Sequence, residues 1–333
     1  MATTYLQRAE TDPQGSTVSR QKVTMSMWIK RDVLGGEDCF YSHYYDASNY
    51  LHMRFNSDNT LQMEEHVGGS NTILLTTDRV FRDVSGWYHF CFECDSTQSV
   101  STDRIKIYVN GVQETSFSST TYPTQDDPFL VDGGSGYYTY IGQRGAGSLY
   151  FTGLMTYYIY VNGTAYPAST FGEVDSDTGE WKILTSPTVT YGDKGFFILK
   201  NGNSVTDQSG EGNNFTVGGG TLTNTEDCPD DVFATWNPLA NQTVAGGTFT
   251  TGNNTWQSGN SYYSYMPSTI GVAKGKFYWE VKVSAMTGAT EWHLLGISSS
   301  QPTALTSYLG ELQYDYSYYG QNGYKYTNNT GIG

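Results

Sequence analysis

The chain has 333 residues, a formal net charge of −15 and a sequence pI near 4.6, which leaves room for about two domains. Its 18 lysines and arginines are thinly spread, so it offers no basic stripe for a nucleic-acid backbone, and we expect no nucleic-acid partner. No apolar run approaches the roughly 20 residues of a membrane span, so we expect no membrane insertion. The 15% aromatic content, with 28 tyrosines and 38 glycines, favours short strands and tight turns over helices.

Apolar residues recur at every second position along the first two thirds of the chain, which predicts strands with one buried face. The alternation is clear at residues 23–29, 88–94 and 105–109. Asn110 and Gly111 then supply the pair of positive φ angles that a two-residue hairpin turn requires. The same pattern continues in three later segments, at residues 138–145, 150–161 and 195–200. The sequence therefore predicts antiparallel strands in two packed sheets.

Two of the four cysteines, Cys91 and Cys94, form a C-x-x-C pair within the strand predicted at residues 88–94. Positions three apart on a strand point to opposite faces, and no second ligand pair accompanies them. We expect two buried thiols and no zinc site.

The alternating pattern stops between residues 221 and 242, in a stretch with two prolines and four acidic residues. We interpret residues 226–242 as a connector between two domains. Alternation resumes at residues 277–283, and this predicts a strand with an apolar face.

The end of the chain is rich in tyrosine and predicts a hairpin. Tyr314, Tyr316 and Tyr318 fall on one strand face, residues 320–323 can form a turn, and residues 324–326 run back. A low-complexity tail would not keep its rings in phase in this way.

Several motifs in order resemble the laminin-G-like, concanavalin A-like jelly roll, and in particular its version in structural proteins of tailed, marine-type bacteriophages. The motifs are TYLQRAE, VTMSMWIKRD, GWYHFCFECDST, RIKIYVNGVQ and FGEVDSDTGEW. The resemblance implies an all-β fold with a jelly roll at residues 1–225, followed by the connector at 226–242.

The segment STIGVAKGKFYWEVKVSA, followed by LLGISSSQ, resembles the opening half of a SPRY domain, which is also a β-sandwich. Residues 243–333 are therefore expected to be the N-terminal part of a SPRY-like sandwich that is truncated here. Its remaining strands would lie beyond Gly333 or come from another subunit.

The resemblance to phage proteins implies a virion structural protein that is assembled in the host cytoplasm. The expected role is a tail fibre, spike or other appendage whose modules recognise a host surface glycan or protein. The expected partners are other virion proteins and further copies of the chain, in a homotrimer by analogy with phage fibres. A purely structural capsid or baseplate decoration is the first alternative.

A glycan-active enzyme is the second alternative, because concanavalin A-like folds include glucanases with alternating carboxylates on one strand. The nearest stretch here is Glu173-Val174-Asp175-Ser176-Asp177, where the last acid is an aspartate and the flanks are typical of a loop. We expect no enzymatic activity and no catalytic residues.

Six tyrosines in three adjacent pairs are the candidate ligand-binding residues, because a pair on a strand must send one ring to each face. They are Tyr44, Tyr45, Tyr137, Tyr138, Tyr318 and Tyr319. Exposed tyrosine suits stacking on sugar rings or packing against another subunit, although it also covers outer sheet faces without a ligand.

The stretch TDQSGEGNNFTV resembles a turn that is common in the laminin-G superfamily, whose modules often hold calcium at the rim. Asp207, Asn213 and Asn214 could supply oxygen ligands for calcium. A tight turn held by their side chains explains the same residues without a metal. We expect no other cofactor.

Overall fold

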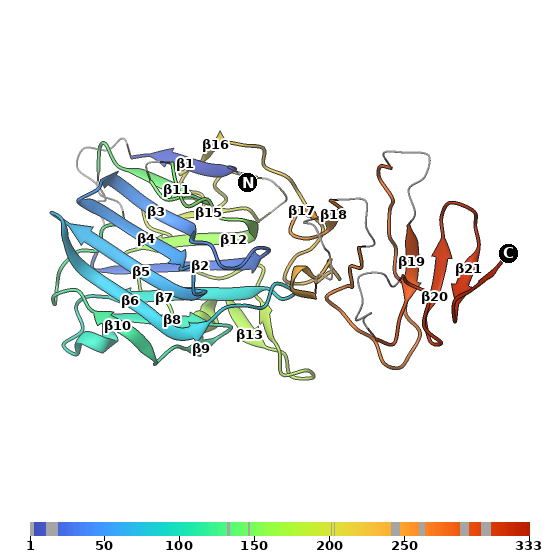
Figure 1. The fold of residues 1–333 in the computed structure, drawn as a ribbon. Coiled ribbons are helices and arrows are strands. Elements are labelled where there is room, and N and C mark those ends of the chain that lie inside the picture. The colour runs from blue at the N-terminus through green and yellow to red at the C-terminus, as the bar shows by residue number, and fades with distance from the viewer. Residues whose placement is uncertain are drawn as a thin grey trace. The chain divides into compact units, whose positions relative to one another are not determined.

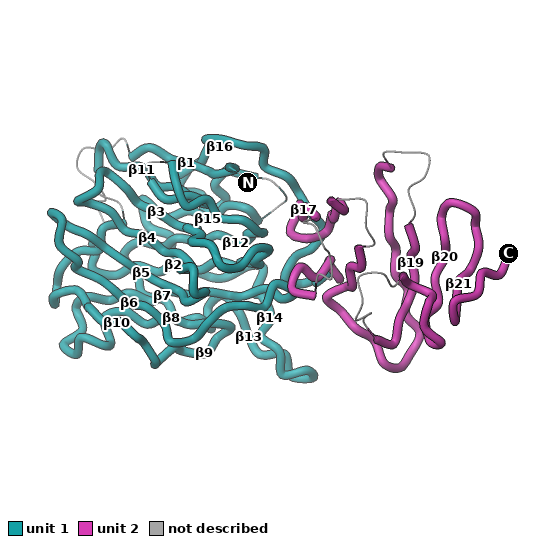
Figure 2. Tube along the Cα trace, viewed as in Figure 1, with its two compact units in different colours: residues 1–233 teal, residues 234–333 magenta. Residues whose placement is uncertain are grey.

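The computed structural model describes residues 3–10, 19–131, 134–145, 147–200, 202, 204–240, 247–259, 264–286, 293–300 and 308–333. The chain divides into two compact units, residues 1–233 and 234–333 (Figure 2). The division falls inside the stretch interpreted as a connector from the sequence.

The larger sheet of the first unit has eight antiparallel strands in the described residues (Figure 1). Their spatial order is β10 (Phe117–Thr121), β6 (Ser70–Val80), β5 (Thr60–Val67), β4 (Asn49–Phe55), β3 (Asp38–Asp46), β11 (Tyr138–Ile141), β1 (Tyr5–Ala9) and β16 (Thr216–Gly219). The first strand therefore lies near one edge, between segments far away in the sequence.

The smaller sheet has six described strands. Their spatial order is β15 (Phe196–Ile198), β12 (Gly153–Asn162), β2 (Lys22–Arg31), β7 (Tyr88–Asp95), β8 (Ile105–Val109) and β9 (Val112–Gln113). Asn110 (φ 48°) and Gly111 (φ 77°) form the tight turn between β8 and β9, which confirms the predicted hairpin.

The core lies between these two sheets and follows the alternation of the sequence. Met25, Met27 and Ile29 of β2 lie in one cluster with Phe90 and Phe92 of β7, and all are almost fully buried. The all-β, two-layer prediction for this unit is confirmed.

The outer face of the six-stranded sheet is also covered. The hairpin of β13 (Gly172–Val174) and β14 (Trp181–Ile183) and the short helix η2 (Ala168–Thr170) contribute to the apolar clusters there. Trp181 donates its indole N–H to His89 Nδ1 at 3.1 Å, so the proton of the imidazole lies on Nε2, 2.9 Å from Ser26 Oγ. Cys91 belongs to this outer layer and Cys94 to the central core, which confirms that the two thiols face opposite sides.

Residues 226–233 close part of this outer face. Asp227 Oδ2 lies 2.6 Å from Lys30 Nζ in an ion pair that is shielded from solvent, and Oδ1 accepts the indole N–H of Trp87 at 3.0 Å. The first part of the expected connector is thus fastened to the first unit.

The described residues of the second unit form two small antiparallel sheets. One pairs β17 (Thr248–Thr250) with β18 (Thr255–Gln257), and the other has the order β19 (Leu294–Ile297), β20 (Tyr316–Tyr319), β21 (Lys325–Thr327) and β22 (Thr330–Ile332). The remaining helical segments are η1 (Ser101–Asp103) in the first unit and η3 (Pro238–Ala240) in the second. At three residues each, none of the helical segments in the described part of the chain could cross a membrane.

The tyrosine-rich hairpin is confirmed, because Ser317 and Tyr318 of β20 pair with Tyr326 and Lys325 of β21. Its faces are the reverse of an ordinary amphipathic strand. Tyr316 and Tyr318 are exposed, whereas Ser317 is buried.

The prediction of a strand at residues 277–283 is wrong. No strand is formed there, and the side chains at both odd and even positions are exposed. An alternating pattern needs a neighbouring strand and a covering layer before it becomes a buried strand, and the described residues provide neither. Whether residues 243–333 form part of a SPRY-like sandwich stays a prediction.

Candidate functional site

Aromatic rings line the outer face of the eight-stranded sheet, the side that points away from the core. They belong to β1, β3, β4, β5, β11 and the loop after β11, and we call them the aromatic face: Tyr5, Tyr44, Tyr50, His52, His66, Tyr138, Tyr140 and Tyr150. Each strand contributes alternate residues, so the rings come together through sheet register.

One half of the aromatic face is a stack on β3, β4 and β5. Tyr50 lies opposite Tyr44 on one side and His66 on the other. Its ring centroid is 6.5 Å from that of Tyr44 and 4.5 Å from that of His66, with nearly parallel planes. Cross-strand pairing thus produces a continuous aromatic row.

The other half runs across β11 and β1. The rings of Tyr138 and Tyr140 stack with centroids 5.8 Å apart, and Tyr5 lies 6.1 Å from both Tyr140 and Tyr150. Tyr138 is paired in register with Tyr44, so the two halves meet between β11 and β3. Tyr138 is the most exposed of these rings, at 40%.

Charged groups surround the stack. Glu64 accepts a hydrogen bond from the Tyr50 hydroxyl at 3.1 Å and lies 3.4 Å from Arg54 and 3.0 Å from His66 Nε2. The guanidinium of Arg144 lies over the Tyr50 ring, 5.9 Å from its centroid. Burial and the neighbouring carboxylate of Glu64 raise the pKa of Tyr50 to about 12, so its hydroxyl remains a donor at neutral pH.

His52 lies within the stack, 4.1 Å from the Tyr50 ring and 6.2 Å from the Tyr44 ring. It is 1% exposed, and neither ring nitrogen has a hydrogen-bond partner among the described residues. Burial lowers its pKa to about 3, so the imidazole is neutral and keeps one donor and one acceptor.

The structure brings together four of the six tyrosines chosen from the sequence. Tyr44 and Tyr138 lie on the aromatic face, while Tyr45 and Tyr137 contact each other with centroids 5.0 Å apart. Tyr137 also stacks on His43, at 5.0 Å. Tyr318 and Tyr319 belong to β20 in the second unit, and ligand binding by the six tyrosines stays a prediction.

The other polar members of this site were missed from the sequence. They are Tyr50, His52 and Arg54 on β4, Glu64 and His66 on β5, and Arg144 after β11. The signal was present in the segment NYLHMRF, where the three polar or aromatic residues alternate with Leu51, Met53 and Phe55. The pattern separates the two faces, but it does not show which neighbouring strands share them.

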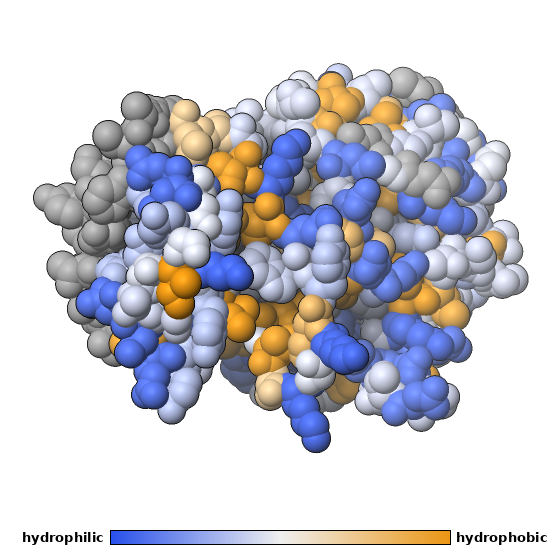
Figure 3. Space-filling model, turned by 90° about the vertical axis from the view of Figure 1, so that its right-hand side faces the viewer, coloured by the Kyte–Doolittle hydropathy of each residue, from blue (hydrophilic) through white to orange (hydrophobic). Residues whose placement is uncertain are grey.

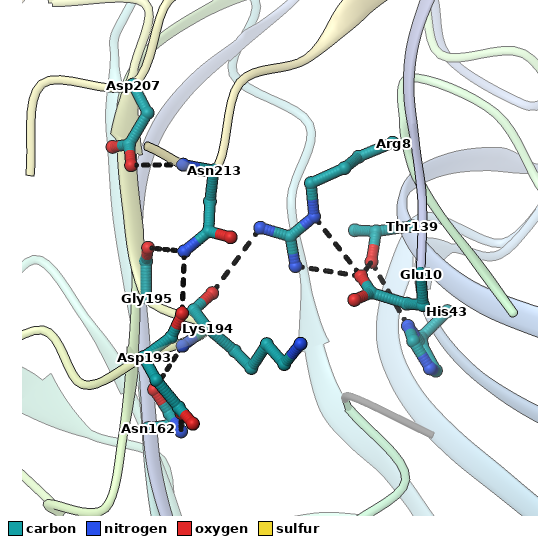
Figure 4. A network of polar contacts seen from close by, with 10 residues as sticks. All are labelled: Arg8, Glu10, His43, Thr139, Asn162, Asp193, Lys194, Gly195, Asp207 and Asn213. Atoms are coloured by element: carbon teal, nitrogen blue, oxygen red, sulfur yellow. Dashed lines mark hydrogen bonds and ion pairs between the residues drawn. The ribbon is translucent and has the colours of Figure 1, made fainter. Parts of the chain in front are cut away.

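The turn that contains Asp207, Asn213 and Asn214 fastens β15 to its neighbours (Figure 4). Asp207 Oδ1 accepts the backbone N–H groups of Phe197 and Ser209, and Oδ2 accepts the hydroxyl O–H of Ser209 and the backbone N–H of Asn213. Asn213 donates to the carbonyls of Asp193 and Gly195. These bonds account for the turn by itself.

Calcium at this turn stays a prediction, which a calcium-dependent rise in melting temperature would test. Within the described residues, no group of three or more His, Cys, Asp or Glu side chains is arranged to hold a metal ion.

A second network lies beside this turn (Figure 4). Arg8 donates to Glu10 Oε1 at 2.8 Å and to the Lys194 carbonyl at 3.4 Å. Thr139 also donates to Glu10, and its hydroxyl lies 3.1 Å from His43 Nδ1. Burial lowers the pKa of His43 to about 3, so its imidazole is neutral. Through Arg8 and Lys194, the network joins β1 of one sheet to the segment before β15 of the other.

Of the three alternating carboxylates, only Glu173 lies in a strand, because Asp175 and Asp177 lie beyond the end of β13. Glu173 is in β13, and Asp175 lies in the following turn, where it accepts the backbone N–H groups of Asp177 and Thr178. Lys182 lies 3.2 Å from Glu173 and 3.4 Å from Asp175. These hydrogen bonds, and to a lesser degree Lys182, hold the pKa of Asp175 below its ordinary value.

The same hairpin borders a cleft of about 360 Å³ lined by Trp181, Lys182, Asp230 and six neighbouring residues. Its lining combines an indole with charges of both signs.

Solved structures of similar shape come from several sources. The native heptameric SAP-like pentraxin from Limulus polyphemus is 18% identical, with a TM-score of 0.33, over 49% of this chain and 71% of that chain. Domain 4 of AbnA, a GH43 extracellular arabinanase from Geobacillus stearothermophilus, is 20% identical, with a TM-score of 0.35, over 46% and 66%. The CBM40 of the Ruminococcus gnavus IT-sialidase is 13% identical, with a TM-score of 0.31, over 46% and 90%.

No curated protein matches the chain at a significant level. Residues 4–158, which include the whole aromatic face, match the sequence profile of the concanavalin A-like lectin/glucanases superfamily. Together with its two packed antiparallel sheets, this match identifies the first unit as a concanavalin A-like, laminin-G-like jelly roll.

Proposed function

We propose that the first unit binds a glycan on its aromatic face and has no catalytic role. The observation that carries the proposal is the continuous row of rings on this face, which runs from the packed Tyr50 through Tyr44 to the exposed Tyr138 and has charged side chains beside it. Sugar rings have apolar C–H faces that pack on aromatic rings, and hydroxyl edges that pair with charged and amide groups. The superfamily of the matched region includes lectins, which agrees with this assignment.

The accessible part of the site is centred on Tyr138. Tyr50 and His52 are 6% and 1% exposed, whereas Tyr138 is 40% exposed. A glycan would therefore stack on Tyr138 and the partly exposed rings beside it, while the buried rings hold the surface in place.

Replacing Tyr138 with alanine is expected to weaken glycan binding about tenfold, because it removes the most accessible stacking ring. Affinity electrophoresis in gels that contain laminarin, dextran or alginate would measure the change. Tyr324→Ala is the matched control, since Tyr324 is 43% exposed but lies outside the aromatic face.

Equal retardation of Tyr138→Ala and wild type, or no retardation of wild type in any gel, would contradict the proposal. Measuring new reducing ends in the same samples separates binding from hydrolysis. Sugar release by wild type would favour the enzyme alternative.

We further propose that the chain belongs to the virion of a tailed bacteriophage, as a tail fibre, spike or other appendage that contacts the host surface. The order of motifs in the first 240 residues supports this setting, and a capsid or baseplate decoration is its alternative. The SPRY-like assignment of residues 243–333 and the contacts with other virion proteins belong to the same proposal.

Gold-labelled antibody against the first unit is expected to mark the tail tips of purified phage particles. Electron microscopy of labelled particles would show this directly. Label spread over capsid faces and absent from the tail would contradict the fibre assignment and favour the decoration alternative.

A further inference from the structure

The second unit exposes a run of large apolar side chains. All residues from 270 to 286 are exposed, including Phe277 at 58%, Trp279 at 51% and Val283 at 44%. Figure 3, which shows the face on the side of the carboxyl terminus, has apolar side chains gathered among hydrophilic ones. Exposed apolar side chains that gather on one surface are typical of an interaction site.

The sequence of this run is typical of a β-strand, but the run pairs with no strand among the described residues. Phe277, Trp279, Val281 and Val283 alternate with polar or amphipathic residues, yet no described residue pairs with their backbone. A segment of this composition whose backbone pairs with none of the described residues is a template for adding a strand from another chain.

The charges within the run indicate which strand it accepts. Glu280 and Lys282 are two residues apart, with Val281 between them. When a strand pairs antiparallel with a second copy of itself, the residues opposite each other are related by a two-fold axis. If that axis passes through Val281, Glu280 of each copy faces Lys282 of the other.

This register also matches the apolar residues. Trp279 of each copy lies opposite Val283 of the other, Val281 lies opposite itself, and Phe277 lies opposite Ala285. Aromatic and β-branched residues in opposite positions stabilise antiparallel pairs. The neighbouring register, centred on Glu280, would place two carboxylates opposite each other, which is unfavourable.

We propose that residues 277–285 form a self-complementary edge through which two copies of this chain pair as antiparallel strands about Val281. The contact joins copies two at a time and is independent of the glycan site. A second copy fits better than an unrelated partner because the segment supplies both members of each charge pair and both members of each apolar pair.

Reversing one charge is expected to break this contact. In Glu280→Lys, lysines face each other at both ends of the register, and in Lys282→Glu, glutamates do so. Either variant should weaken dimerisation at least about tenfold relative to wild type, since two ion pairs become two repulsive pairs. Analytical ultracentrifugation of the full chain over a range of concentrations would measure the dissociation constant.

Mixing the two variants in equal amounts gives the decisive result. Their opposite charges are complementary, so the mixture should recover dimers that neither variant forms alone, and Glu280→Lys/Lys282→Glu should dimerise like wild type. Lys325→Glu, another exposed lysine in the second unit, is the matched control and should leave dimerisation unchanged.

Three outcomes would overturn the proposal. They are a wild-type chain that stays monomeric at all concentrations, dimers that tolerate both single reversals, and a mixture that remains monomeric. Because both substituted residues are exposed, unchanged circular dichroism would show that each variant keeps its fold.

Discussion

Replacing Asp227 with alanine is expected to lower the free energy of unfolding of the first unit by about 3–5 kcal/mol. Lys30 Nζ and Asp227 Oδ2 are 2.6 Å apart, with side-chain exposures of 1% and 0%. Without the carboxylate, the Lys30 ammonium would remain in a place that water does not reach. The indole N–H of Trp87 would lose its acceptor as well. Urea denaturation followed by tryptophan fluorescence would measure the loss.

Two companion variants separate charge burial from loss of contacts. Lys30→Met with Asp227→Leu removes both charges and should recover most of the stability, because apolar pairs often replace buried ion pairs without loss. Lys22→Met removes a lysine that is 43% exposed and lies 3.2 Å from Asp95, and should cost less than about 1 kcal/mol. A loss from Asp227→Ala as small as that from Lys22→Met would contradict the expected burial.

This ion pair illustrates what could not be predicted from the sequence. Its two residues are 197 positions apart, and Asp227 belongs to an acidic stretch that was interpreted as a connector. Period-two alternation predicted β2, β7 and β8 correctly, because a strand with one buried face has apolar residues at every second position of its own sequence. A contact between a loop and a distant strand produces no such pattern in either segment.

The same distinction applies to the candidate site, where the contacts between residues of different strands could not be predicted from the sequence. The pairing of Tyr44 with Tyr138 requires knowing that β3 lies beside β11, although the two strands are almost one hundred residues apart. His52 packs between the rings of Tyr44 and Tyr50, and the Tyr44 ring comes from a neighbouring strand. Sheet order supplies both facts, and sheet order is a property of the whole fold.

The second unit shows the limit of the alternating pattern itself. Residues 277–283 have the pattern of a half-buried strand but are exposed on both sides, whereas β20 keeps its predicted alternation with the polar side buried. Asp315 is 3% exposed and accepts a hydrogen bond from the Ser298 hydroxyl at 2.5 Å. Alternation predicts that two faces differ, and the surrounding chain decides which one is buried.

Replacing Glu65 with glutamine is expected to change the free energy of unfolding of the first unit more favourably at pH 8 than at pH 5. The expected difference between the two pH values is about 2–3 kcal/mol. The Glu65 carboxyl lies in the core, where it accepts the Leu130 N–H at 2.6 Å and the Thr72 hydroxyl at 2.7 Å. Burial raises its pKa from 4.5 to about 7. Between these values the native state holds a proton that the unfolded chain has released, so stability falls as the pH rises through this window.

Comparing the variant with wild type at each pH removes the contribution of the histidines. Burial lowers the pKa of His43, His52 and His89 to about 3, so the unfolded chain binds protons below pH 6.5 that the native state does not, and acid destabilises both proteins alike. Glutamine can still accept from Leu130 and donate to Thr72, so the comparison isolates the charge. Urea denaturation of both proteins at pH 5 and pH 8 would measure it. A stability difference that is the same at the two pH values would show that Glu65 titrates normally and that its pocket is open to water.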